Sequence, residues 1–180
     1  MSNGEEKIIV EKAISGESSA FGLLYDKYQP QIYRFIYLKT SHREEAEDLT
    51  HQVFLNAWQK IENYKFKGYP FSTWLYQIAR NEVIDFYRTR KSNLNIETIP
   101  EPTIKESFEK KLDIDLELEK IKEAIIELSS EQQNVIIMRF VNDIPLQEIA
   151  DAMGKSNGAI RILQYRAIKN LQKNLSKKQS

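Results

Sequence analysis

The side chains best suited to bind a ligand are the aromatic and basic residues that alternate between Tyr64 and Lys91. This stretch carries a net charge of +4. Positive side chains follow phosphates while flat rings stack on exposed bases, so the pattern is typical of a surface for unpaired nucleic acid. The alternative is that most of these rings belong to a helical core and the basic residues form a solvated face.

Residue types for catalysis or metal binding are sparse. Imidazole comes only from His42 and His51. His51 follows Glu47 by four residues, but no third ligand accompanies the pair, so we expect a surface histidine and no metal site. The carboxylates near them open an expected helix, where the macrodipole favours acids without any catalytic role. No phosphate loop, nucleophile elbow or pair of catalytic acids is visible, and we predict neither an enzyme nor a cofactor.

The distribution of charge matters more than its sum, which is zero over 180 residues. The segment 64–91 carries +4 and 155–180 carries +7, whereas 97–131 between them carries −6. This distribution of charge indicates two nucleic-acid contacts, joined by an acidic spacer that does not itself bind DNA. With no cysteine and no long apolar run, the sequence predicts a cytoplasmic protein without disulfides, zinc fingers or a thiol nucleophile.

Apolar residues recur every three or four positions through the first 91 residues, which predicts an all-helical domain. We expect the second of its helices to pass through Pro30 with a kink, and a capping box at Ser41–Glu44 to begin the third. The fourth helix should start near Ser72. Its expected buried residues are Trp74, Leu75, Ile78 and Ile84, and its expected outward residues are Asn81, Asp85 and Arg88.

The second half begins with a linker signature of prolines and polar residues over 93–103. A stripe from Ile114 to Leu128 predicts a helix, and a capping box at Ser129–Gln132 opens another, with Val135, Ile136, Met138 and Phe140 as its apolar residues. A short helix from Pro145 to Gly154 follows. A longer basic helix, capped by Ser156, then reaches about Leu175.

These last two helices form a helix-turn-helix pattern, whose second helix enters the major groove of DNA. Arg161, Tyr165 and Lys169 group on one side, with Arg166 at the margin, and Gly158 leaves clearance near the helix start. The apolar residues Ile160, Leu163, Ala167 and Leu171 group on another side. The alternative is an ordinary amphipathic hairpin with a basic exterior.

The whole set resembles a bacterial sigma factor of the extracytoplasmic-function (ECF) type of the sigma-70 family. AFGLLYDKYQPQIYRFI resembles the start of sigma region 2, AEDLTHQVFLNAW its polymerase-binding helix, and FSTWLYQIARNEVIDFYR the helix that acts on the minus-ten element. LSSEQQNVIIMRF and IPLQEIADAMGKSNGAIRILQYRAIKNL resemble region 4. The resemblance implies an all-α protein with two small helical domains: a four-helix region 2 over 1–91, a flexible acidic linker over 92–111, and a helix-turn-helix region 4 over 112–180.

The resemblance also implies residue roles. Contacts with the beta-prime clamp helices of RNA polymerase fall on Asp48, Leu49, Phe54 and Trp58, and on His51 and Gln52, where the family usually has glutamine and an acid. The loop with Lys67, Gly68, Tyr69 and Phe71 would hold a flipped minus-ten base, with Asn81 lining its pocket and Arg88 at the basic exit. The minus-thirty-five residues are Ser156, Gly158, Arg161, Tyr165, Arg166 and Lys169. Ile162, Leu163 and Ile168 replace polar or basic family residues, which implies an unusual promoter.

The implied function is transcription initiation. Such a factor binds core RNA polymerase through the beta-prime clamp helices and the beta subunit, and directs the polymerase to specific promoters. The resemblance also implies an anti-sigma factor that keeps the sigma factor inactive. A repressor or activator that uses the same helix-turn-helix as a dimer is the alternative. That alternative leaves Tyr64–Lys91 and the polymerase-binding helix without a purpose.

Overall fold

The computed structural model describes residues 3–65, 68–93 and 114–178, and every regular element in these ranges is helical. The first part contains α1 (Asn3–Ile14), α2 (Ser18–Thr40), α3 (Arg43–Lys60), the 3₁₀ turn η1 (Ile61–Asn63) and α4 (Phe71–Asn93). The second part contains α5 (Ile114–Ile126), α6 (Ser130–Ile136), the π-helical turn η2 (Ile137–Val141), α7 (Leu146–Met153) and α8 (Asn157–Lys178). The predicted all-α class is confirmed. The predicted linker lies mostly outside the described residues.

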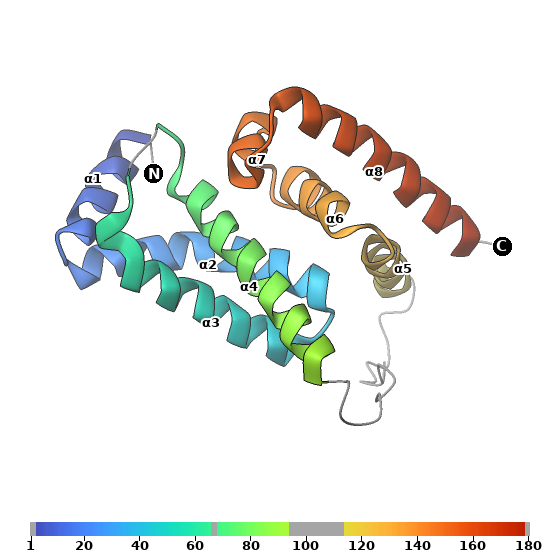
Figure 1. Cartoon of the computed structure of the whole chain (residues 1–180), viewed down its shortest axis with the longest axis horizontal. Helices are drawn as coiled ribbons and strands as arrows, with labels where there is room; N and C mark the ends of the chain where they lie inside the picture. Colours follow the sequence, from blue (N-terminus) through green and yellow to red (C-terminus); the bar gives the residue numbers. More distant parts are fainter. Residues whose placement is uncertain (1–2, 66–67, 94–113, 179–180) are drawn as a thin grey trace.

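The first four helices pack as a bundle in which α2 contacts α1, α3 and α4 (Figure 1). Helix α2 continues through Pro30, as predicted. The largest fully buried side chains of this bundle are Leu24, Ile32, Phe35, Ile36, Phe71, Leu75 and Tyr76. Their separations of one, three, four and eight residues place them on one face of α2 and one face of α4, and these faces form the core.

The start of α3 differs from the prediction. Ser41 adopts a left-handed backbone conformation, with φ of 58°, and its N–H donates to the Tyr37 carbonyl at 2.8 Å. Ser41 therefore ends α2 and does not cap α3, which follows His42 without a side-chain cap. The capping box at Ser129–Gln132 is confirmed, because Ser129 Oγ accepts from the Gln132 N–H and Gln132 Oε1 accepts from the Ser129 N–H.

Three apolar residues of the predicted helices are exposed: Ile84, which was expected in the core, Ile121 of the Ile114–Leu128 stripe, which is 42% exposed, and Phe140. Ile84 is 50% exposed because α4 turns Ala79 and Val83 inward, and the next residue lies about 100° further round the helix. Phe140 is 54% exposed in the π-helical turn, where the widened helix changes the register that the sequence pattern assumes. The prediction was therefore right about the elements and wrong about the burial of Ile84 and Ile121.

Helices α5 to α8 form the second bundle, in which α8 packs against α5, α6 and α7. Gly154, with φ of 63°, ends α7 as predicted, and the Ser156 hydroxyl accepts from the Ala159 N–H at the start of α8. The buried apolar residues are Ala124, Ile125, Leu128, Val135, Ile136, Ile137, Met138, Ile144, Ile149, Ala150, Ala152, Met153, Ile160 and Ala167. Across the described residues, no helix has the length and apolar character that a membrane span requires.

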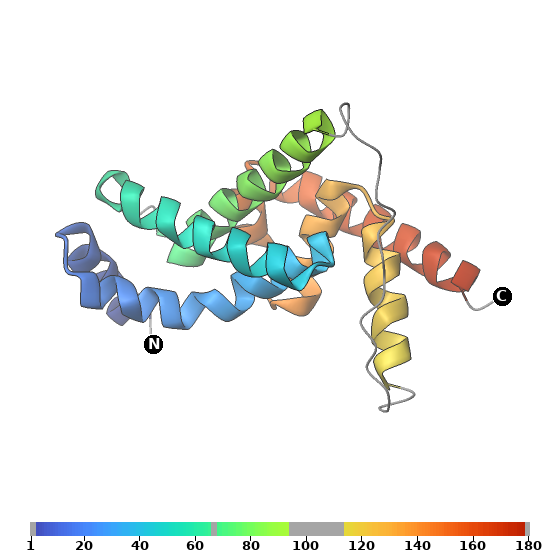
Figure 2. The same ribbon diagram turned by 90° about the horizontal axis from the view of Figure 1, so that it is seen from below.

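The two bundles touch along α4 and α7, and along α2 with α5 and η2 (Figures 1 and 2). Arg80 Nη1 donates to the Ala152 carbonyl at 2.7 Å, and the neighbouring Gln77 amide donates to the Asp151 carbonyl at 3.2 Å. Because these carbonyls end α7, the contact fixes the first helix of the helix-turn-helix against α4.

The side-chain nitrogen of Lys39, at the end of α2, is buried against α6 where the two bundles meet, and 4% of the residue is exposed. Lys39 Nζ donates to Asn134 Oδ1 at 2.6 Å and to the Ser130 hydroxyl at 3.3 Å. Burial lowers the pKa of Lys39 from 10.5 to about 7, and the positive charge of the nearby Arg80 contributes a smaller part of this shift. A neutral amine can keep its hydrogen bonds here, whereas the charged form carries a desolvation cost.

A pH dependence follows from this lysine. Between pH 7 and 9.5 the unfolded chain binds the Lys39 proton and the folded chain releases it, so the free energy of unfolding should rise with pH, by about 1 kcal/mol per pH unit. Urea unfolding at several pH values measures this slope. Lys39→Met should remove most of it, and an unchanged slope in that variant would show that Lys39 is not its source.

Candidate functional site

The outward face of α3 carries three of the predicted polymerase contacts. Asp48, His51 and Gln52 are exposed, whereas the opposite face buries Ala46, Thr50, Val53, Phe54 and Ala57. Leu55, which the sequence analysis missed, is 49% exposed and follows His51 by four residues and Gln52 by three. That spacing places it in the same stripe. The face therefore combines polar groups with one apolar contact, as protein interfaces commonly do.

Phe54 is not part of this face, which corrects the prediction. It is 3% exposed, and its ring centroid lies 4.7 Å from that of Tyr25 in an edge-on contact between α3 and α2. Trp58 packs at 4.9 Å on Phe21 and is partly buried, as is Leu49. These three residues hold α3 on α2, and Phe54 has almost no surface to offer a partner.

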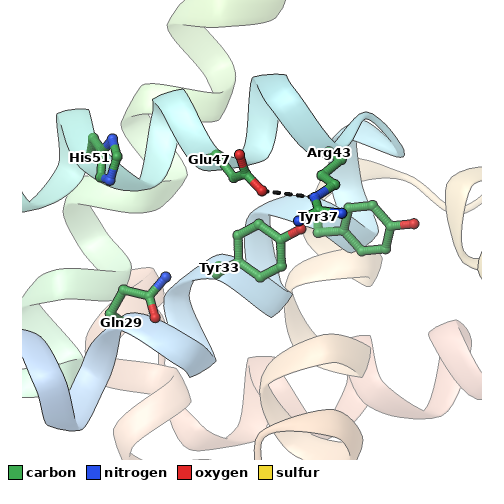
Figure 3. Close-up of a pocket in the computed structure, with 6 residues that line it drawn as sticks. All are labelled: Gln29, Tyr33, Tyr37, Arg43, Glu47 and His51. Carbon is green, nitrogen blue, oxygen red and sulfur yellow. Dashed lines mark hydrogen bonds and ion pairs between the residues drawn. The ribbon is translucent and has the colours of Figure 1, made fainter.

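A shallow hollow of about 510 Å³ opens between α2 and α3 beside the α3 face (Figure 3). The rings of Tyr33 and Tyr37 stack there at 5.9 Å, and Arg43 Nε donates to Glu47 Oε1 at 2.9 Å. Burial and then Glu47 raise the pKa of Tyr33, against an opposing effect of Arg43. Gln29 and His51 complete the lining. Flat rings with a charged rim suit a protein segment.

The loop before α4 holds part of the predicted minus-ten site. Lys67 lies outside the described residues. Gly68 has a φ of 81°, a conformation that favours glycine, and it is exposed, while Tyr69 is partly buried. Phe71 has no exposed surface, because its ring packs against Tyr64 at 5.3 Å and against Trp74. The Phe71 ring therefore belongs to the core, and within the predicted loop Gly68 and Tyr69 are the described residues with accessible surface.

Asn81 and Arg88 are exposed on α4, as predicted. Arg88 pairs with Asp85 at 3.1 Å in a solvent-exposed contact. Asn81 lies ten residues beyond Phe71, or about 15 Å further along the helix axis. A nucleic-acid strand that touches both the Tyr69 loop and Asn81 must therefore run along α4, within one turn of the Gln77 and Arg80 contacts with α7.

All of the predicted minus-thirty-five residues lie at the accessible surface of α8 and its cap: Ser156, Gly158, Arg161, Tyr165, Arg166 and Lys169. Lys169 Nζ lies 4.8 Å above the Tyr165 ring, which stabilises both side chains. Ile160 and Ala167 are buried on the opposite side. Ile162 is 56% exposed beside Arg161, so the face mixes basic and apolar contacts, a mixture that can read both phosphates and base edges.

Comparison with known proteins agrees with this geometry. Residues 24–93 match the family model described as Sigma-70 region 2, and residues 124–173 match Sigma-70, region 4. The chain is 36% identical to the ECF RNA polymerase sigma factor BldN of Streptomyces coelicolor over 166 residues, which cover 91% of this chain and 63% of BldN. It thus spans less than two thirds of that relative's length.

Solved structures show the same fold. CnrH, in complex with the cytosolic domain of CnrY, has a TM-score of 0.74 at 22% identity, covering 95% of this chain and 97% of CnrH. The sigma factor RpoE, crystallised with the anti-sigma factor NepR from Bartonella quintana, has a TM-score of 0.70 at 25% identity, covering 87% and 96%. The chain belongs to the sigma-70 family of RNA polymerase sigma factors. The relative BldN bears the name of an ECF RNA polymerase sigma factor.

Proposed function

We propose that this chain is a transcription initiation factor that binds core RNA polymerase and directs it to a specific set of promoters. The observation that carries the proposal is the pairing of two accessible surfaces, the α3 face with Asp48, His51 and Gln52, and the basic outer side of α8. A repressor needs only the second surface. The protein performs no bond-breaking chemistry, needs no cofactor, and acts as a monomer in the cytoplasm.

The work is divided between two regions. Region 2, over 1–91, binds the beta-prime clamp helices through α3 and captures unpaired minus-ten bases with Gly68, Tyr69, Asn81 and Arg88. Region 4, over 112–180, contacts the minus-thirty-five duplex through α8 and lies near the beta subunit. The acidic segment 92–111 joins them. Capture of unpaired bases makes strand opening favourable because stacking and edge contacts offset the cost of unstacking.

An anti-sigma factor is a further proposed partner. The RpoE structure contains such a partner, and RpoE is 25% identical to this chain over most of its length. The stacked tyrosines beside the α3 face offer apolar surface of the kind that a competing protein segment can cover. An inhibitor that occupies this hollow would exclude the polymerase.

Run-off transcription with core RNA polymerase, on the promoter of the chain's own gene, tests the proposed function. A transcript above the level of core polymerase alone is expected. No transcript, under conditions where circular dichroism shows a folded protein, would contradict the proposal. Tight and specific binding to a palindromic duplex without core polymerase would instead favour the dimeric regulator.

Arg161→Ala tests how α8 reads DNA. If Arg161 contacts a base edge, the variant should bind its upstream element about 1–3 kcal/mol more weakly and lose preference at one base pair. Affinity for a set of singly substituted duplexes measures this, with the holoenzyme as the binding species. Lys177→Ala, an exposed cation near the end of α8, is the control that should keep the preference. Equal weakening on every duplex would identify Arg161 as a phosphate contact.

A further inference from the structure

Glu6 is a buried carboxylate in α1, a helix that precedes the residues matched by the sigma region 2 model. The residue is 3% exposed. Its Oε2 accepts from Lys27 Nζ and from the Tyr28 hydroxyl, and its Oε1 accepts from the Phe71 backbone N–H at 2.7 Å. One side chain therefore joins α1, α2 and the start of α4.

The electrostatics keep this carboxylate charged. Burial alone raises the pKa of Glu6, but the hydrogen bonds from Lys27, Tyr28 and the Phe71 N–H outweigh it, and the pKa lies below its ordinary value. A buried charge that is fully hydrogen-bonded resists displacement, because removing one partner leaves the others unsatisfied. The contact is therefore suited to holding a backbone atom at a fixed place.

That backbone atom begins α4. The first N–H groups of a helix have no partner within the helix, and the residue before Phe71 is Pro70, whose side chain cannot cap it. Glu6 supplies the missing acceptor from 65 positions earlier in the chain. The Phe71 ring is fixed as well, since it packs against Tyr64 at 5.3 Å and against Tyr28 at 6.1 Å.

We propose that Glu6 is a positioning residue for promoter opening, which fixes the end of the Gly68–Pro70 turn and so orients Tyr69 toward an unpaired minus-ten base. This inference rests on the proposed function. Two peptide units separate Tyr69 from the anchored Phe71 nitrogen, and Pro70 between them has a constrained φ. A shift of the Phe71 nitrogen should therefore move Tyr69 by a similar amount.

The test compares three affinities for Glu6→Gln. The free variant is titrated with core polymerase, and the holoenzyme formed with it is titrated with minus-thirty-five duplex and with a single-stranded minus-ten oligonucleotide from a promoter identified by run-off transcription. We expect the single-strand affinity to fall about tenfold while the other two change less than twofold. Amide hydrogen exchange at Phe71 should become faster. Glu11→Gln, an exposed acid on the same helix, is the matched control and should leave all four measurements unchanged.

Tyr28→Phe is the second variant, because it removes one donor to Glu6 and keeps the ring that packs on Phe71. It should show the same selective loss at smaller size, even if Glu6→Gln fails to fold. Equal loss of all three affinities would reduce Glu6 to a stabilising role and overturn the inference. Unchanged single-strand affinity together with faster amide exchange at Phe71 would also overturn the inference. A wild-type holoenzyme that does not prefer the minus-ten strand over a scrambled strand would overturn the proposed function itself.

Discussion

Replacing Phe54 with alanine is expected to lower the free energy of unfolding by about 3–5 kcal/mol, the usual cost of removing a buried phenylalanine ring. The ring lies between α2 and α3, with its centroid 4.7 Å from Tyr25 and 6.5 Å from Phe21. The variant leaves a cavity at the contact that holds the polymerase-binding helix. Affinity for core polymerase should therefore fall only in proportion to the unfolded fraction.

Urea unfolding followed by tryptophan fluorescence measures this change, since both tryptophans, Trp58 and Trp74, lie in the first bundle. Asp48→Ala is the matched control on the same helix. It is exposed, so its stability should stay within about 0.5 kcal/mol of the wild type while its polymerase affinity falls. If Phe54→Ala keeps wild-type stability but binds polymerase weakly, Phe54 contacts the polymerase directly, and the packing described above is wrong.

Tyr69→Ala and Asn81→Ala are each expected to slow promoter opening about tenfold while leaving folding and polymerase binding intact. A base stacked on the Tyr69 ring contributes about 1–3 kcal/mol, and a hydrogen bond from the Asn81 amide to a base edge contributes about 0.5–1.5 kcal/mol. A tenfold change corresponds to about 1.4 kcal/mol, which lies within both ranges. Asn81 is exposed and Tyr69 is only partly buried, so neither replacement leaves a large cavity. The affected step is the capture of unpaired bases.

Fluorescence of 2-aminopurine placed in the minus-ten element reports the rate of opening. Glu11→Gln, an exposed acid on α1 outside the proposed site, is the control and should open DNA at the wild-type rate. A promoter with a preformed minus-ten bubble separates melting from capture, because both variants should also bind that template less tightly. Opening at the wild-type rate in both variants would show that neither residue contacts the unpaired strand.

Much of the fold could be predicted because its causes are local. The periodicity of apolar residues, the Ser129–Gln132 capping box and the left-handed Gly154 depend on neighbours a few positions away, and all three are confirmed. Ser41 shows the limit of such reasoning. The same serine can cap the next helix or end the previous one, and the path of the chain from α2 to α3 decides in favour of the second role.

The candidate site could be predicted where exposure follows from helical phase, as for Arg161 and Tyr165. It could not be predicted for Phe54 and Phe71, because a motif position says which residue type is expected there and not whether its ring faces a partner or a neighbouring helix. The Phe54 ring is buried against Tyr25 of α2, and the Phe71 ring is buried against Tyr64, Trp74 and Tyr28. Leu55 was missed because it is not among the motif positions that the resemblance supplied, although its spacing from His51 and Gln52 puts it on the same exposed face.

The amino-acid sequence alone determines that this chain is helical, that it carries two cationic regions around an acidic one, and that it resembles a sigma factor. Tertiary structure decides which buried charges matter. Glu6 meets Phe71 across 65 positions, and Lys39 meets Asn134 across 95. No sequence pattern relates such distant residues, because burial of a charge depends on which partners the folded chain brings within hydrogen-bonding distance.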